Sequence, residues 1–182
     1  MKTTMKVCCL VVLLTLAAQA DIEKIAQVCD SGVCFYWWPK LPQVRGWHQD
    51  RERSFQYSIN ALAPDGFSFA NAQTVMYAAA AYKPRIPETR TLNRFIEDDK
   101  KHAAASRPAI VITEVESLAT GDGQTMRSFT FFPATKGDWE QVSYGEEGDY
   151  YLVFTLSSRS KLGFDTSQSA YHELLASYRA KM

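Results

Sequence analysis

The chain has 182 residues, and its 20 basic and 20 acidic side chains give a formal net charge of zero at pH 7 with neutral histidines. General nucleic-acid binders need an excess of basic residues, because their affinity comes from releasing counterions from phosphates. The charge balance therefore argues against that class. The length suits one hydrophobic core, and no linker rich in Pro, Gly or Ser divides the sequence, so we expect a single mature domain.

Residues 1–20 (MKTTMKVCCLVVLLTLAAQA) have the pattern of a secretory signal peptide. Lys2 and Lys6 precede an apolar run over 7–18, and the segment closes on the small residues Ala18 and Ala20. The run is shorter than the roughly 20 residues that cross a bilayer, so a retained membrane anchor is the weaker interpretation. We expect a periplasmic or secreted protein without a stable anchor. No Asn-x-Ser/Thr glycosylation site occurs, which favours a bacterial source.

Residues 21–46 form an N-terminal extension in this interpretation, followed by a domain over 47–182. The extension carries Cys29 and Cys34, the two cysteines that remain after cleavage. An even number of cysteines in an oxidising compartment indicates a disulfide, and the short spacing makes it a local clip. A redox C-x-x-C pair or a zinc site would need a different spacing or further ligands nearby.

The first half of the domain predicts mixed elements. Pro39 and Pro42 exclude a regular helix between Trp37 and Trp47, so this segment is expected to be extended. Alternation over 55–62 (FQYSINAL) predicts a strand, and Pro64-Asp65-Gly66 a turn. The segment 75–82 (VMYAAAAY) is compatible with a helix or a buried strand, and we choose the strand. A helix over 91–105 follows, with Thr91 as its cap.

The second half predicts two hairpins and a terminal helix. Segments 109–118 and 124–132 flank a Gly-Asp-Gly turn, and segments 139–144 and 150–156 flank a longer turn over 145–149. Apolar spacing predicts a helix over about 166–180, with Tyr171, Leu174, Leu175 and Tyr178 on its buried face. Short hairpins join antiparallel strands, so the fold class is α+β, an antiparallel sheet flanked by helices.

This order of elements resembles the PsbP-like and DcrB-like family of α/β/α sandwich proteins. The resemblance rests on PDGFSF at 64–69, on KGDWEQVSYGEEGDYYLVFTLSSRS at 136–160 and on AYHELLASY at 170–178. It covers roughly residues 47–178 and involves turn and core residues, so it transfers no catalytic position. Members of the family are mostly binding or assembly factors, and the resemblance implies the same here. The Cys29–Cys34 clip is not part of that pattern.

The candidate catalytic motifs fail on inspection. His172-Glu173 begins like the zinc-protease motif H-E-x-x-H, but Ala176 stands where the second histidine is needed. No Gly-x-Ser-x-Gly elbow is present. His48 lies among aromatic and charged residues, where an ordinary structural or surface histidine is the simpler interpretation. The acidic residues around 146–149, with Asp138 and Glu140, do not match the spacing of a calcium loop. We predict no enzyme activity, cofactor or metal.

Partner binding is the remaining signal. Basic residues gather around Pro84 and Pro87, aromatic residues gather after the cysteine pair, and acidic residues occupy the second hairpin turn. Each group has a plain alternative, namely a solvated loop, buried aromatic rings or a solvated turn. The candidate partner-binding residues are Trp37, Trp38, Arg85, Arg90, Glu146, Glu147 and Asp149.

These observations lead to two hypotheses. The first is an exported, non-enzymatic binding or assembly factor of the bacterial cell envelope, whose partner is another envelope or secreted protein. The alternative is an exported inhibitor or immunity protein that blocks a hydrolase or toxin, with the acidic turn over 145–149 as its plug. An enzyme is the third possibility.

Overall fold

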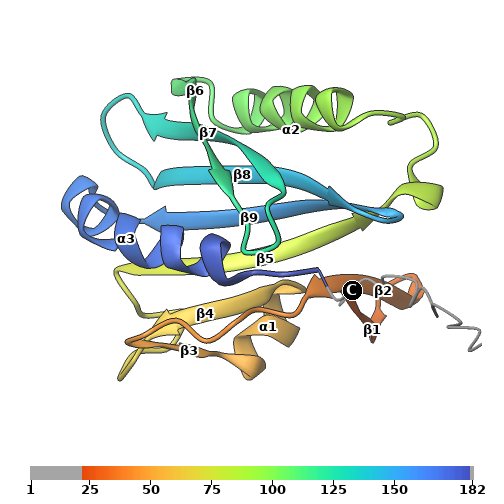
Figure 1. Cartoon of the computed structure of the whole chain (residues 1–182), viewed down its shortest axis with the longest axis horizontal. Helices are drawn as coiled ribbons and strands as arrows, with labels where there is room; N and C mark the ends of the chain where they lie inside the picture. Colours follow the sequence, from red (N-terminus) through yellow and green to blue (C-terminus); the bar gives the residue numbers. More distant parts are fainter. Residues whose placement is uncertain (1–21, 181–182) are drawn as a thin grey trace, which may run out of the picture.

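The computed structural model describes residues 22–180, and the predicted signal peptide lies outside this range. Within the range, nine strands form one antiparallel sheet (Figure 1). Its main order is β1-β2-β5-β9-β8-β7-β6, and β4 pairs with both β5 and β3. The strands are β1 Ile22–Cys29, β2 Gly32–Pro39, β3 Trp47–Gln49, β4 Asn60–Pro64, β5 Thr74–Tyr82, β6 Ile110–Ala119, β7 Thr125–Pro133, β8 Trp139–Glu147 and β9 Tyr150–Ser158.

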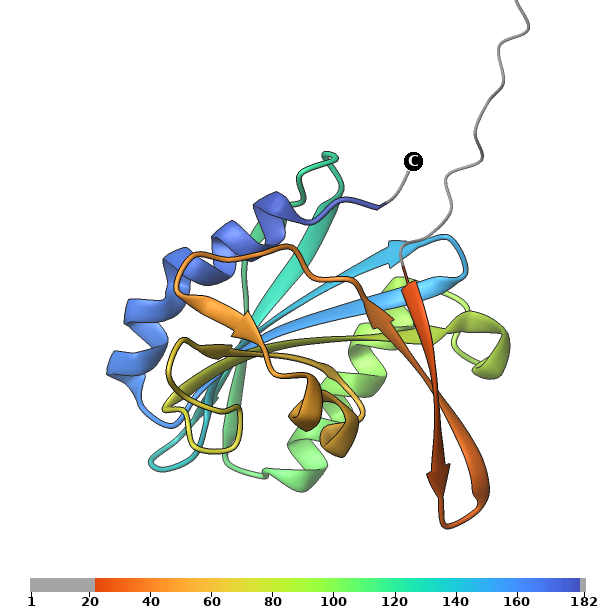
Figure 2. The ribbon, with the colours of Figure 1, turned by 90° about the horizontal axis from the view of Figure 1, so that it is seen from below.

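Three α-helices pack on this sheet, which confirms the predicted α+β class with an antiparallel sheet flanked by helices (Figure 2). They are α1 Arg51–Tyr57, α2 Leu92–Ser106 and α3 Lys161–Ser177, and a short 3-10 helix, η1 Lys83–Arg85, follows β5. Helix α3 lies on one face of the sheet, whereas α1 and α2 lie on the other (Figure 2). Among the helices of the described range, none has the length and apolar character needed to span a membrane.

Strand alternation supplies a separate core to each face. On the α3 face, Leu174 and Leu175 pack in a cluster with Met76, Phe154 and other apolar side chains of the sheet. On the α2 face, Ile96 packs in a second cluster with aromatic residues of β7 and β8. The sheet is therefore the middle layer of the molecule, and neighbouring residues of β9 belong to different cores.

Several predicted elements are confirmed. The segment 75–82 is the strand β5, and its alanines fit a strand that pairs with a neighbour on each side. Thr91 caps α2, where its side chain accepts a hydrogen bond of 3.2 Å from the backbone N–H of Arg94. The first predicted hairpin is β6–β7. The predicted buried face of the last helix, which Tyr171 and Tyr178 share with two leucines, is buried.

Other predicted bounds are wrong. The strand predicted over 55–62 is instead the end of α1 followed by β4. The side chain of Asp50 caps the start of α1 by accepting a hydrogen bond from the backbone N–H of Arg53, and Ser58 ends the helix in the left-handed conformation at φ 59°. The turn predicted over 145–149 is shorter, since Glu147 pairs with Tyr150 across only two residues. The last helix begins at Lys161 because Ser160 caps it, five residues before the predicted start.

The segment expected as an N-terminal extension forms the hairpin β1–β2, which continues the sheet. It pairs with β5 at a single position, Trp37 opposite Ala80. The hairpin extends away from the rest of the sheet (Figure 2). Gln27 also connects it to α1, because its side chain donates to the carbonyl oxygen of Phe55 at 3.0 Å. Residues 40–46, which follow Pro39 and include Pro42, contain no helix, as predicted.

Candidate partner-binding surface

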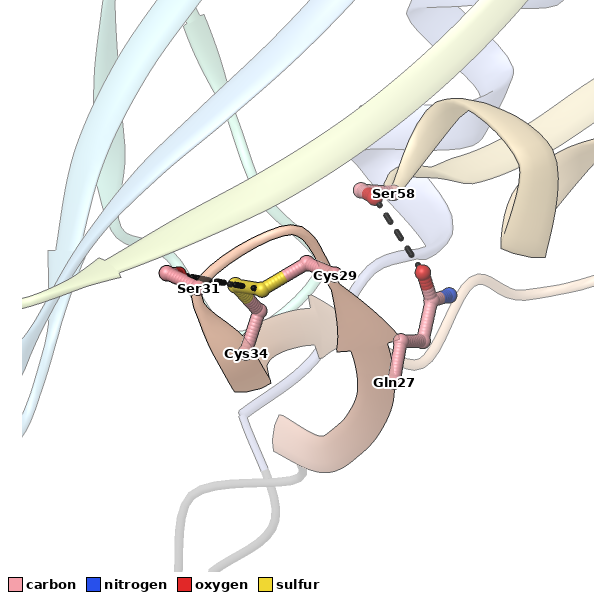
Figure 3. Close-up of a disulfide and its surroundings, with 5 residues drawn as sticks. All are labelled: Gln27, Cys29, Ser31, Cys34 and Ser58. Atoms are coloured by element: carbon pink, nitrogen blue, oxygen red, sulfur yellow. Dashed lines mark hydrogen bonds between the residues drawn. A yellow bond between two sulfur atoms is a disulfide. The ribbon is translucent and has the colours of Figure 1, made fainter.

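The two cysteines form the predicted disulfide, which closes the tip of the β1–β2 hairpin (Figure 3). Cys29 pairs in register with Gly32, and the hydroxyl of Ser31 lies 3.3 Å from the sulfur of Cys29. Val28 and Val33 face each other beside this link and are 91% and 61% exposed. The disulfide therefore fixes a hairpin end whose apolar side chains are open to contact.

A group of aromatic and cationic side chains lies between this hairpin and the end of β5. We define the aromatic–cationic surface by five of its members: Lys24, Phe35, Trp37, Tyr82 and Arg85. The rings of Trp37 and Tyr82 stack with their centroids 5.4 Å apart. The Arg85 guanidinium lies 4.9 Å from the Trp37 ring and 5.3 Å from the Phe35 ring, and the Lys24 ammonium lies 4.2 Å from the Phe35 ring.

Local structure explains why these side chains meet. Phe35 and Trp37 are two residues apart on β2, so they point to the same face of the strand. Trp37 lies opposite Ala80, and Tyr82 is the next residue of β5 on that face. The helix η1 then begins at Lys83 and contains Pro84, and the backbone N–H of Ile86 donates to the carbonyl oxygen of Lys83 at 3.0 Å, so this turn carries Arg85 back over the rings.

The two cations of the surface have no carboxylate partner in the described part of the chain. Lys24 and Arg85 are exposed, and neither forms an ion pair within residues 22–180. Their nearest charge-stabilising contacts are ring faces, which attract a cation through the aromatic quadrupole. When one face of the Arg85 guanidinium lies against an aromatic ring, its N–H groups are still able to donate hydrogen bonds to a second partner. The geometry can therefore accept carboxylates from outside the chain.

An apolar cavity of about 230 Å³ adjoins this surface in the gap between β2 and β5. Its lining includes the alanine run 79–81, Tyr36 and Ile86, together with members of the surface. The gap exists because β2 and β5 pair at one position and then diverge. A partner side chain could enter here beside the cations.

The structure removes two predicted residues from direct partner contact. Trp38 is fully buried because strand alternation turns it toward α1, where its ring lies 5.2 Å from that of Phe55. Glu147 is 5% exposed, and Tyr178 donates a hydrogen bond to its carboxylate. The prediction that Trp38 and Glu147 contact a partner is therefore wrong, because both side chains are buried. Arg90 is exposed in the segment between η1 and α2.

The acidic turn is held by Lys83 rather than standing free. The Lys83 ammonium donates to the carbonyl oxygen of Gly148 at 2.8 Å and lies 3.4 Å from the carboxylate of Glu146. The Lys83 backbone N–H also bonds to the Asp149 carbonyl oxygen at 2.9 Å. Of the three predicted acidic residues, Asp149 is the one that remains exposed without an ion pair in the described part of the chain.

The other sequence candidates lie apart from this surface. His48 is exposed on β3, 3.4 Å from the carboxylate of Asp65, and His172 is exposed on α3. Over residues 22–180 no group of three or more His, Cys, Asp or Glu side chains is arranged to hold a metal ion. Asp138 and Glu140 belong to a different cavity, on the face of the sheet that carries α1.

Sequence reasoning missed two members of the surface, namely Lys24 and Tyr82. Phe35 belongs to the aromatic group after the cysteine pair that the sequence singled out, although it was not among the candidate partner-binding residues. Lys24 meets Phe35 and Trp37 through the register of the β1–β2 hairpin, and Tyr82 meets Trp37 through the pairing of β2 with the distant strand β5, so neither contact shows in the residue pattern.

No family model matches this sequence, and no curated protein matches it either. Among solved structures, the chain is similar to the solution structure of cyanobacterial PsbP (CyanoP) from Synechocystis sp. PCC 6803. The match has a TM-score of 0.44 and 12% sequence identity, and it covers 93% of this chain and 98% of that chain. The predicted resemblance to PsbP is thus confirmed as a weak likeness, which says nothing about site residues or function.

Proposed function

We propose that this chain is an exported, non-enzymatic binding or assembly factor of the bacterial cell envelope that holds a protein partner on its aromatic–cationic surface. The single observation that supports the proposal most is the pair of exposed cations, Lys24 and Arg85, resting on ring faces without a carboxylate partner in the described chain. A periplasmic or secreted location fits the Cys29–Cys34 disulfide, because such bonds persist in oxidising compartments.

The aromatic part of the surface would supply contact area. Trp and Tyr are enriched at interface positions where truncation costs the most binding energy. Trp37 is half-buried and stacked on Tyr82, which in turn lies 5.3 Å from the ring of Tyr150. Because neighbouring rings already restrict these side chains, little rotamer entropy would be lost when a partner covers them.

The cationic part would select the partner. Arg85 can present several N–H donors in one plane, which suits a carboxylate on the facing surface. We therefore expect a partner that offers Asp or Glu side chains around an apolar centre. At about 0.1 M salt, attraction between exposed charges more than about 10 Å apart is largely screened, so the association rate should fall as the salt concentration rises.

The test is quantitative capture of partners from native envelope and secreted fractions by the mature protein with its disulfide formed. Trp37→Ala and Arg85→Glu change the surface, and Phe67→Ala and Arg45→Glu are matched controls at exposed positions elsewhere. We expect one salt-sensitive partner whose affinity falls at least about tenfold with either surface variant and less than about twofold with either control. Equal capture by all four variants would refute the proposal.

The inhibitor alternative predicts a different result in the same assay. Ala substitutions at Glu146 and Asp149 would abolish the capture of a hydrolase or toxin, whereas the surface variants would leave it intact. The contacts of Lys83 with this turn already occupy one of these carboxylates, so the binding proposal expects both acidic substitutions to have little effect.

A further inference from the structure

A second cavity, of about 390 Å³, lies on the opposite face of the sheet, beside α1. We call it the α1-side pocket. It lies toward the start of β5, whereas the aromatic–cationic surface lies at the end of that strand. Its lining includes Tyr57, Phe69, Tyr77, Asp138, Glu140, Ser157 and Arg159. This volume falls within the range of small-molecule sites, which runs from about 300 to 1,000 Å³.

One wall of the pocket is aromatic. The rings of Tyr57 and Phe69 lie 5.5 Å apart, and those of Phe69 and Tyr77 lie 6.0 Å apart. Asp50 fixes the backbone of this wall, because its carboxylate accepts hydrogen bonds from the N–H of Phe69 at 2.8 Å and from the N–H of Arg53 at 3.1 Å. The wall is thus formed before any ligand arrives, and it suits an apolar or aromatic group.

The opposite side carries one free charge of each sign. Asp138 directly precedes β8 and Arg159 directly follows β9, whose end residues Trp139 and Ser158 are paired, and both charged residues line the pocket. Asp138 has no ion pair in the described chain, and the Arg159 guanidinium donates to the carbonyl oxygen of Ala70 at 2.9 Å. Arginine has five N–H groups, so donors remain for a ligand.

The remaining carboxylate of the pocket is already neutralised. Glu140 accepts a hydrogen bond from Arg107 at 2.7 Å and another from the hydroxyl of Ser157 at 3.2 Å. The side chain of Glu140 is only 12% exposed, whereas Asp138 and Arg159 are exposed, so Glu140 is the less accessible carboxylate. The α1-side pocket therefore offers a ligand one carboxylate, one guanidinium and an aromatic wall, with a net charge of zero.

We propose that the α1-side pocket binds a small zwitterion with an apolar or aromatic side chain, as in a free amino acid. Its ammonium pairs with Asp138, its carboxylate pairs with Arg159 and its side chain packs on the aromatic wall. Because Asp138 and Arg159 flank the same paired end of β8 and β9 and line one pocket, a single small ligand can reach both charges. A ligand with a single charge leaves one of the two groups unpaired.

Three probes that share one aromatic ring test the charge requirement by calorimetric titration. L-phenylalanine carries both charges, phenethylamine only the ammonium and 3-phenylpropionate only the carboxylate. We expect saturable binding of L-phenylalanine, at least about tenfold tighter than that of either single-charge probe. Absence of saturable L-phenylalanine binding at millimolar concentration overturns the proposal, and so does phenethylamine binding equally well.

Two variants locate the site. Asp138→Asn and Arg159→Gln should each weaken L-phenylalanine at least about tenfold. The matched controls Asp165→Asn and Arg45→Gln, at exposed positions outside the pocket, should change its affinity less than about twofold. Asp138→Asn should leave the affinity for 3-phenylpropionate unchanged or increase it, because the substitution removes the repulsion between the Asp138 carboxylate and the carboxylate of the probe. Full L-phenylalanine affinity in both pocket variants overturns the assignment. These experiments do not involve the aromatic–cationic surface, so they succeed or fail independently of the proposed function.

Discussion

Replacing both Cys29 and Cys34 with serine should open the β1–β2 hairpin while leaving the rest of the sheet folded. The disulfide spans a sequence separation of 5, and the chain-entropy model for so short a loop gives about 2 kcal/mol of stabilisation. The hairpin pairs with β5 at one position only, so most of this free energy should stabilise the hairpin locally rather than the two cores. Converted to an equilibrium constant, the loss is about 30-fold.

Amide hydrogen exchange measures this local opening directly. We expect exchange of the ladder amides of β1 and β2 to accelerate by about 10- to 50-fold in the double variant, with the amides of β8 and β9 changing less than about twofold. Reducing the wild-type protein should give the same pattern. The reasoning is refuted if the hairpin amides are unchanged, or if hairpin and core amides accelerate together by the same factor.

Three further predictions concern the core and the dependence of stability on pH. Leu174→Ala removes a fully buried side chain and should lower the free energy of unfolding by about 2–5 kcal/mol in denaturant titration; a loss under about 1 kcal/mol would contradict its core position. The pKa of Asp122 lies below its usual value. Burial alone would raise this pKa, but the hydrogen bonds that the carboxylate accepts from Thr120 and Ala180 have the larger combined effect. Asp122 therefore contributes stability above its unfolded pKa of about 4 that is lost as the pH falls further, and Asp122→Asn should reduce the acid-side loss. Burial raises the pKa of Tyr171 well above its usual value. The stability that neutral Tyr171 contributes is therefore complete below its unfolded pKa of about 10 and is lost as the pH rises from there toward the folded pKa. Tyr171→Phe should make the alkaline fall in stability less steep, and an unchanged slope would argue against burial of that hydroxyl as the cause.

Local sequence signals were sufficient for most of the sheet and for α2. Thr91 as a cap and the Gly-containing turn after β6 act through contacts with near neighbours in the chain, so the sequence itself encodes them. The segment around Phe55 misled, because its alternation resembles a strand. The decisive contacts were the cap from Asp50 and the left-handed turn at Ser58, which the alternation pattern does not weigh.

The candidate surface was only partly predictable for the same reason. Trp37 and Arg85 were identified from composition, but their proximity depends on the pairing of β2 with β5. Trp38 and Glu147 were predicted as contact residues because a tryptophan or a glutamate can be buried or exposed. Their burial follows from the face of the strand on which they lie, and that face is known only once the strand register is known. The α1-side pocket depends on the pairing of β8 with β9 and was not predicted at all.

Oxidative footprinting of the complex with the captured partner tests the proposed function most directly. We predict that binding protects Trp37, Tyr82 and Phe35 from oxidation, while Phe67, exposed in the turn after β4, reacts as fast as in the free protein. Protection of Phe67 or of other distant side chains, with Trp37 and Tyr82 unchanged, would show that the partner binds elsewhere and would contradict the assignment of the aromatic–cationic surface.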